Sequence, residues 1–133
     1  MITIHYLGNE FVEKDTLAIK IAEKIKDKYK KVKFKKIETF DDMINIKDKY
    51  YFMDVCEGIS KARLINDIAI FENIRSITSH DLDFGFFMKL NDGLGEINQI
   101  NIICLPEKTY EDIEKDVDKL IKKLLGETKD EKN

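Results

Sequence analysis

The feature that most limits how this chain can fold is the alternation of short apolar runs with longer amphipathic stretches. Residues 50–55 and 99–105 are apolar at most positions, as in strands that are buried on both faces. Residues 17–25 and 113–124 instead repeat apolar side chains every three or four positions, which is the period of a helix. The alternation predicts an α/β fold: a three-layer sandwich in which helices flank a mostly parallel central sheet of about five strands.

The individual elements follow from the same periodicity. We expect strands at residues 2–7, 32–37, 50–55 and 99–105, and helices at 15–25, 39–46, 82–90 and 109–126. Residues 57–75 predict one or two further short strands in a hairpin-like excursion. The lysines of the second strand predict that it lies at an edge of the sheet. Thr109 and Asp112 are expected to open the last helix, and Gly126 to end it.

Length and charge limit the classes of function. The chain has 133 residues, which predicts a single domain at residues 1–126 and a frayed C-terminal tail at 127–133. The net charge of −3 offers no strong basic field for nucleic acid, and we find no basic amphipathic arm for a membrane surface. Neither a signal peptide nor a membrane-spanning stretch is recognisable, so we expect a cytoplasmic monomer whose cysteines are reduced.

Three potential metal ligands lie at or just after the expected strand ends: Asp15, Asp54 and His80. Loops at the carboxyl ends of parallel strands converge on one crevice, where ligands bind in open α/β sheets. Asp54 is the most informative of the three, because a carboxylate that follows Tyr-Tyr-Phe-Met is costly to bury unless something compensates its charge. Asp15 also fits as the N-cap of the helix that follows it, and His80 as a structural or capping histidine.

The chemistry of these side chains predicts which ion they would hold. Two carboxylates and one imidazole form a mixed oxygen and nitrogen ligand set, which suits Zn²⁺, Ni²⁺, Mn²⁺ or Fe²⁺ better than Ca²⁺. Three protein ligands leave coordination positions open for water or for a substrate group, whereas a closed structural site usually has four. The sequence therefore predicts a divalent cation with open positions at the edge of the sheet.

Several segments, in order along residues 2–125, resemble the hydrogenase maturation endopeptidases, a family that trims the C-terminus of the large subunit of nickel–iron hydrogenases. The turn Gly8-Asn9, followed by Asp15, is similar to the opening motif of the family and its first metal-binding carboxylate. Phe52-Met53-Asp54 is similar to the central strand that ends in the second carboxylate. Ser79-His80-Asp81-Leu82 is similar to the segment that carries the third ligand.

The resemblance implies a function and a mechanism. It implies an endopeptidase that recognises nickel already installed in the immature large subunit and then releases a short C-terminal peptide. Asp15, Asp54 and His80 are implied as both the catalytic and the metal-contacting residues, and Asp81 as a residue that orients His80 or caps a helix. The implied metal is a divalent ion, nickel, supplied by the hydrogenase large-subunit precursor, which is the implied partner.

Two other functions stay open at this point. The chain has Tyr6-Leu7, Ile103 and Leu105 where the family usually has glycine or glutamine, so a non-catalytic docking module of the same fold is one alternative. A receiver-like phosphoacceptor domain is the other, because it too would have an aspartate at the end of its third strand. Receiver domains require an acidic pair after the first strand and a lysine before a proline after the last strand. This chain has Gly8-Asn9 and Leu105-Pro106 at those places.

Overall fold

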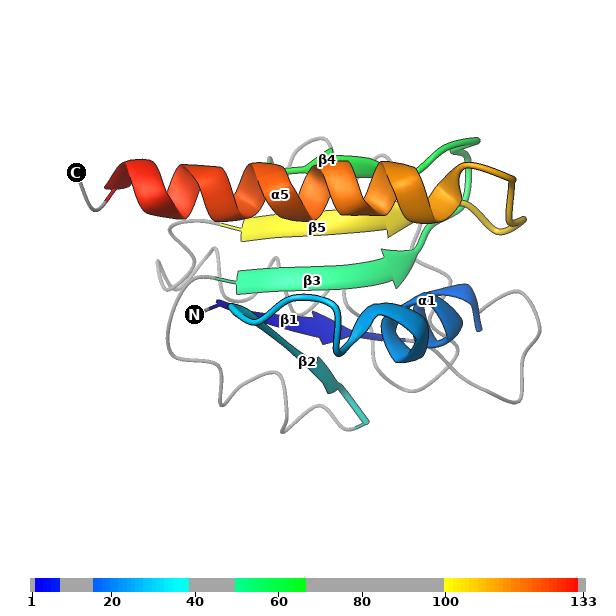
Figure 1. Ribbon diagram of the computed structural model, residues 1–133. Coiled ribbons are helices and arrows are strands. Elements are labelled where there is room, and N and C mark those ends of the chain that lie inside the picture. The colour runs from blue at the N-terminus through cyan, green and yellow to red at the C-terminus, as the bar shows by residue number, and fades with distance from the viewer. Residues whose placement is uncertain (1, 8–15, 39–49, 67–99, 132–133) are drawn as a thin grey trace, which may run out of the picture.

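The computed structural model describes residues 2–7, 16–38, 50–66 and 100–131, which form a mostly parallel sheet and two helices (Figure 1). The elements in chain order are β1 (Ile2–Tyr6), α1 (Leu17–Ile25), β2 (Val32–Lys36), β3 (Tyr50–Val55), β4 (Arg63–Ile65), β5 (Ile100–Leu105) and α5 (Ile113–Glu131). The five strands lie in the order β2-β1-β3-β5-β4. Only β4 runs antiparallel to its neighbour. The predicted α/β class, with a mostly parallel sheet of five strands, is confirmed.

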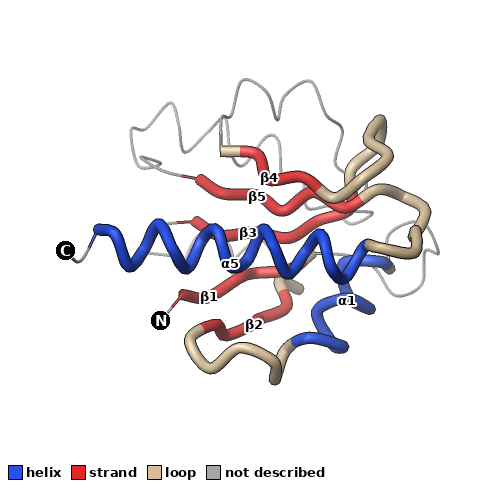
Figure 2. The backbone as a smooth tube through the Cα atoms, turned by 45° about the horizontal axis from the view of Figure 1, so that its top comes forward, coloured by secondary structure: helices blue, strands red, loops and turns tan. Residues whose placement is uncertain are grey.

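Both described helices pack on one face of the sheet (Figure 2). Alternate residues of the central strands point toward them, among them Ile4, Met53 and Ile103, each with no exposed surface. The apolar stripes of the helices complete this cluster through Ala18, Ile21, Ala22, Ile25, Ile113, Val117, Ile121 and Leu124. These are the positions that the helical period predicts, because side chains three and four residues apart share one face of a helix.

The opposite face of the central strands is shielded from water as well. Phe52 and Ile102 are paired across β3 and β5, and Asp54 and Cys104 form the next pair on the same face. Phe52 is 1% exposed and the other three have no exposed surface. Burial on both faces explains why these strands read as almost continuous apolar runs, and it is the burial pattern that a three-layer sandwich requires.

The helix ends differ from the sequence expectation. The N-cap of α1 is Thr16, so Asp15 does not occupy the cap position. Helix α5 begins at Ile113 rather than at Thr109, and Asp112 accepts the first helical hydrogen bond from the amide of Asp116. The same helix continues to Glu131, although we expected Gly126 to end it and a tail to follow. A glycine inside a helix costs only about 1 kcal/mol relative to alanine, which the flanking turns can offset.

The remaining predicted elements can be compared with the structure only where it describes them. Strand β2 lies at one edge of the sheet, as its lysines predicted. Strand β4 is a short strand within residues 57–75, as expected, and it pairs with β5. Residues 67–75, on which the expected hairpin depends, lie outside the described residues. The helices predicted at 39–46 and 82–90 fall outside the described residues. None of the helices in the described ranges has the length and apolar character that a membrane span requires.

Candidate functional site

Asp54 lies at the carboxyl end of β3, in the middle of the sheet. Among the residues that the structure describes, it is the one charged side chain that is buried, with no exposed surface. Because β1, β2, β3 and β5 are parallel, their carboxyl ends meet at the same edge. The structure therefore places this predicted site residue where ligands bind in open α/β sheets.

The contacts of Asp54 include a backbone amide and a thiol. Its Oδ1 atom accepts a hydrogen bond of 2.8 Å from the amide of Val55. Its backbone carbonyl accepts a weaker one from the Cys56 thiol, with an Sγ–O distance of 3.9 Å. A carboxylate removed from water needs donors or a cation to offset its desolvation. The Cys56 thiol contacts the backbone carbonyl and not the carboxylate, so this contact does not offset the desolvation of the carboxylate.

Two buried thiols accompany the carboxylate. Cys56 and Cys104 are both free and fully buried in the structure. A hydrogen bond with the Cys104 side chain, together with burial, raises the pKa of the Cys56 thiol far above its usual value, and the charge of Asp54 acts in the same direction. The Cys56 thiol is therefore neutral at physiological pH and is not an activated nucleophile.

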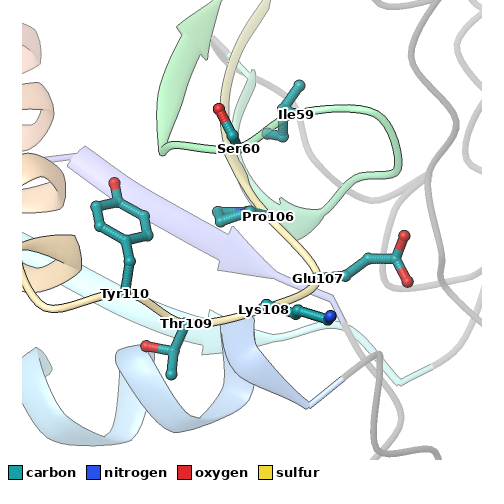
Figure 3. A pocket seen from close by; sticks show the side chains of 7 residues that line it. All are labelled: Ile59, Ser60, Pro106, Glu107, Lys108, Thr109 and Tyr110. Carbon is teal, nitrogen blue, oxygen red and sulfur yellow. The ribbon is translucent and has the colours of Figure 1, made fainter.

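A surface pocket opens at the same edge, between the segments that follow β3 and β5 (Figure 3). Its volume is about 630 Å³, and its lining comprises Ile59, Ser60, Pro106, Glu107, Lys108, Thr109 and Tyr110. The Tyr110 hydroxyl joins three segments: it accepts a hydrogen bond of 2.8 Å from the amide of Ala62 and donates one of 2.8 Å to Asp116 in α5. Burial raises the pKa of Tyr110, so this hydroxyl keeps its proton. The wall of the pocket is thus fixed by hydrogen bonds.

The other predicted site residues are not placed. Asp15, His80 and Asp81, together with the turn Gly8-Asn9, lie outside the described residues, so the structure does not test whether they meet Asp54. Within the described ranges, no three His, Cys, Asp or Glu side chains are grouped so that they could hold a metal ion. A metal contact through Asp54 therefore requires ligands from elsewhere in the chain or from a partner.

Sequence reasoning missed two features of this edge. Cys104 lies directly opposite Asp54 because of the parallel register of β3 and β5, and a register of this kind is not encoded by either strand alone. The pocket after Pro106 was also missed, since Thr109 had been assigned to the helix. The polar run Glu107-Lys108-Thr109 between Pro106 and the apolar stripe of α5 is the signal that could have predicted a loop there.

Comparison of the chain with protein-family models, with curated proteins and with solved structures finds no match. Any function is therefore argued from the residues and their geometry.

Proposed function

We propose that this chain is a cytoplasmic endopeptidase that removes the C-terminal extension of a nickel-loaded hydrogenase large-subunit precursor. In this proposal Asp15, Asp54 and His80 contact the nickel ion that the precursor carries, and they act together in the cleavage. The nickel is part of the substrate, and it polarises the scissile carbonyl or activates a water molecule.

The complete burial of Asp54 at the carboxyl end of β3 supports this proposal most strongly. On the same face of the sheet its neighbours within β3 and β5 are Phe52 and Cys104, and both are buried. An ionised carboxylate at such a position lowers the free energy of unfolding, and groups that carry this cost are frequent at functional sites. A divalent cation delivered by the substrate would compensate the charge at the moment of recognition.

The proposal has a consequence for substrate binding. Because Asp54 has no exposed surface, contact with nickel requires the free chain to open at this end of β3. The amide of Val55 reports that opening, since its hydrogen bond to the Asp54 carboxylate is one that a bound cation would displace or weaken. We expect hydrogen exchange at Val55 to change when the nickel-loaded precursor binds.

The described sheet departs from the phosphoacceptor alternative at one place, the antiparallel strand β4 beside β5. Flavodoxin-like folds, to which receiver domains belong, have the strand order 2-1-3-4-5. The sheet described here has the order 2-1-3-5-4, with β4 antiparallel to β5. The aspartate at the end of β3 is common to both folds, and it therefore does not favour a receiver.

The test is incubation of the purified full chain with a nickel-loaded hydrogenase large-subunit precursor, followed by intact-mass measurement over time. We expect the precursor to lose a short C-terminal peptide, and the D54N variant to abolish that loss. The matched control is E57Q, which removes a carboxylate from an exposed position three residues further on. Cleavage by D54N at the wild-type rate would refute the proposed role of Asp54. An uncut precursor that co-purifies with the chain would support the docking module instead.

A further inference from the structure

The edge strand β2 carries a row of lysines on the same face of the sheet as Asp54. Lys33 is paired with Thr3 of β1, and Lys35 with His5. His5 is in turn paired with Phe52, which shares its face with Asp54. Lys31 immediately precedes the strand at the next alternate position. We call Lys31, Lys33 and Lys35 the lysine row; all three are exposed.

The lysine row belongs to a strongly basic segment in a chain that is acidic as a whole. Residues 26–36 contain seven lysines and one aspartate, whereas the complete chain has a net charge of −3. Lys26, outside the row, forms an ion pair of 3.1 Å with Glu23. Within the described part of the chain, the lysine row takes part in no ion pair. Its three side chains are exposed to solvent, where a partner can contact them.

An acidic protein segment matches this row better than nucleic acid does. Domains that bind nucleic acid usually carry a large net positive charge and use arginine as well as lysine. Here the net charge is negative and residues 26–36 contain no arginine. Alternate residues of a strand lie roughly 6.7 Å apart, which is also the spacing of alternate carboxylates on an extended peptide.

We propose that the lysine row docks an acidic extended segment of the precursor protein. The identity of the partner rests on the proposed function, whereas the acidic character of the segment rests on the row itself. β2 is separated from β3 by one strand (Figure 2), which corresponds to roughly 10 Å across the sheet. A segment held on the row therefore lies on the same face as Asp54 and close to it. It would position the remainder of the substrate at the carboxyl edge.

Lysines on an edge strand also prevent edge-to-edge aggregation, and the test has to separate the two roles. The K33E/K35E variant keeps two charges on the edge, so protection against aggregation is retained while the attraction for acids is reversed. The matched control is K119E/K123E, which makes the same change at exposed positions of α5. The K33Q/K35Q variant is a milder change, and circular dichroism verifies that each variant is folded.

The first measurement is the fluorescence anisotropy of a labelled peptide of alternating glutamate and threonine, titrated with the full chain. We expect K33E/K35E to weaken binding at least about tenfold, K33Q/K35Q to weaken it less, and the control to stay within about twofold. Raising the salt concentration from about 20 to about 200 mM should weaken the binding of the wild type. Equal binding by wild type and K33E/K35E would overturn the proposal.

The second measurement uses the nickel-loaded precursor. We expect K33E/K35E to raise the KM for cleavage more than it lowers kcat. If the wild type fails to cut but the peptide result holds, the proposed function fails and the row still binds acids. If the wild type cuts the precursor and K33E/K35E changes neither the KM nor the affinity for the peptide, the docking role of the lysine row is refuted and the proposed function stands. The proposal would also be overturned if the lysine row bound duplex DNA or anionic vesicles more tightly than the acidic peptide. Salt-sensitive self-association of the chain through the lysine row would overturn it as well.

Discussion

Asp54 is the one buried charged residue among those that the structure describes, and its carboxylate has lost contact with water. The amide of Val55 compensates part of that loss through a bond of 2.8 Å to Oδ1. The neighbouring thiol of Cys56 bonds to the backbone carbonyl and so contributes nothing to the carboxylate. If the residue is retained for function, removing its charge should spare the fold and abolish activity.

We therefore predict that D54N changes the free energy of unfolding by less than about 1 kcal/mol, since the amide oxygen still accepts from Val55. Urea denaturation of the wild type and the variant measures this difference. A loss of more than about 3 kcal/mol would show that the carboxylate is a structural group, and the proposed role of Asp54 would then have to be abandoned.

Tyr29 and Asp118 form a second residue-scale contact, in which the tyrosine hydroxyl donates to the carboxylate and links the α1–β2 connection to α5. This hydrogen bond, followed by the one from Lys122, lowers the pKa of Asp118 below its ordinary value of 3.8. A lowered pKa in the folded state means that the unfolded chain binds protons more readily as the solution becomes acidic. The stabilisation is present above about pH 4 and is lost as the pH falls through the folded pKa.

The prediction for this contact concerns stability against pH. Y29F should lower the free energy of unfolding by about 1 kcal/mol at neutral pH, because Asp118 loses its hydroxyl donor. The difference from the wild type should narrow below about pH 4, where the carboxylate takes up a proton. Chemical denaturation at a series of pH values checks both parts. A difference that is constant down to about pH 2 would contradict the assignment.

At the scale of elements, α5 is held by a single apolar stripe against β3 and β5. Val117 and Ile121 have no exposed surface, whereas Lys119 between them is exposed. V117D should destabilise the fold by several kcal/mol, because it buries an unpaired charge, and K119D should change stability by less than about 1 kcal/mol. Thermal unfolding of the two variants compares these outcomes. Similar melting temperatures would mean that the stripe does not anchor the helix.

The segments around the pocket depend on Tyr110, which bonds both to the amide of Ala62 and to Asp116. Y110F removes both bonds and leaves the ring in place. We expect a loss of about 1–3 kcal/mol in the free energy of unfolding, and faster hydrogen exchange at Ala62. Unchanged protection of that amide would show that another group fixes this wall of the pocket.

Periodicity was sufficient to predict α1 and the buried stripe of α5, because each of these helices buries one face and the pattern reports that burial directly. It failed at the helix ends. Thr109 and Asp112 have the spacing of a capping pair, but the chain enters α5 only after Tyr110 is fixed by its contacts with Ala62 and Asp116. Gly126 was read as a stop signal, yet helix α5 continues past it. At the start of α5 the tertiary contacts of Tyr110 outweigh the local capping signal. At Gly126 the helix tolerates the low helix propensity of glycine.

At the scale of the whole molecule, the parallel sheet determines what the site contains. The apolar character of β3 and β5 predicted burial on both faces, and it marked Asp54 as unusual. The strand order and the pairing of Asp54 with Cys104 depend on which strands become neighbours, and a strand's own sequence does not specify its partner. The lysine row also depends on strand pairing. Each lysine can be read from the sequence, but the register of the strands places the row on the same face as Asp54.

The nickel dependence of precursor processing tests the role of Asp54 most directly. The purified chain is incubated with the same large-subunit precursor in its nickel-loaded and nickel-free forms, and the intact mass of each is followed over time. We predict loss of a short C-terminal peptide from the nickel-loaded form only, and no loss from either form with D54N. Equal cleavage of both forms would contradict the assignment of Asp54 to nickel contact, and cleavage of neither would contradict the proposed endopeptidase activity.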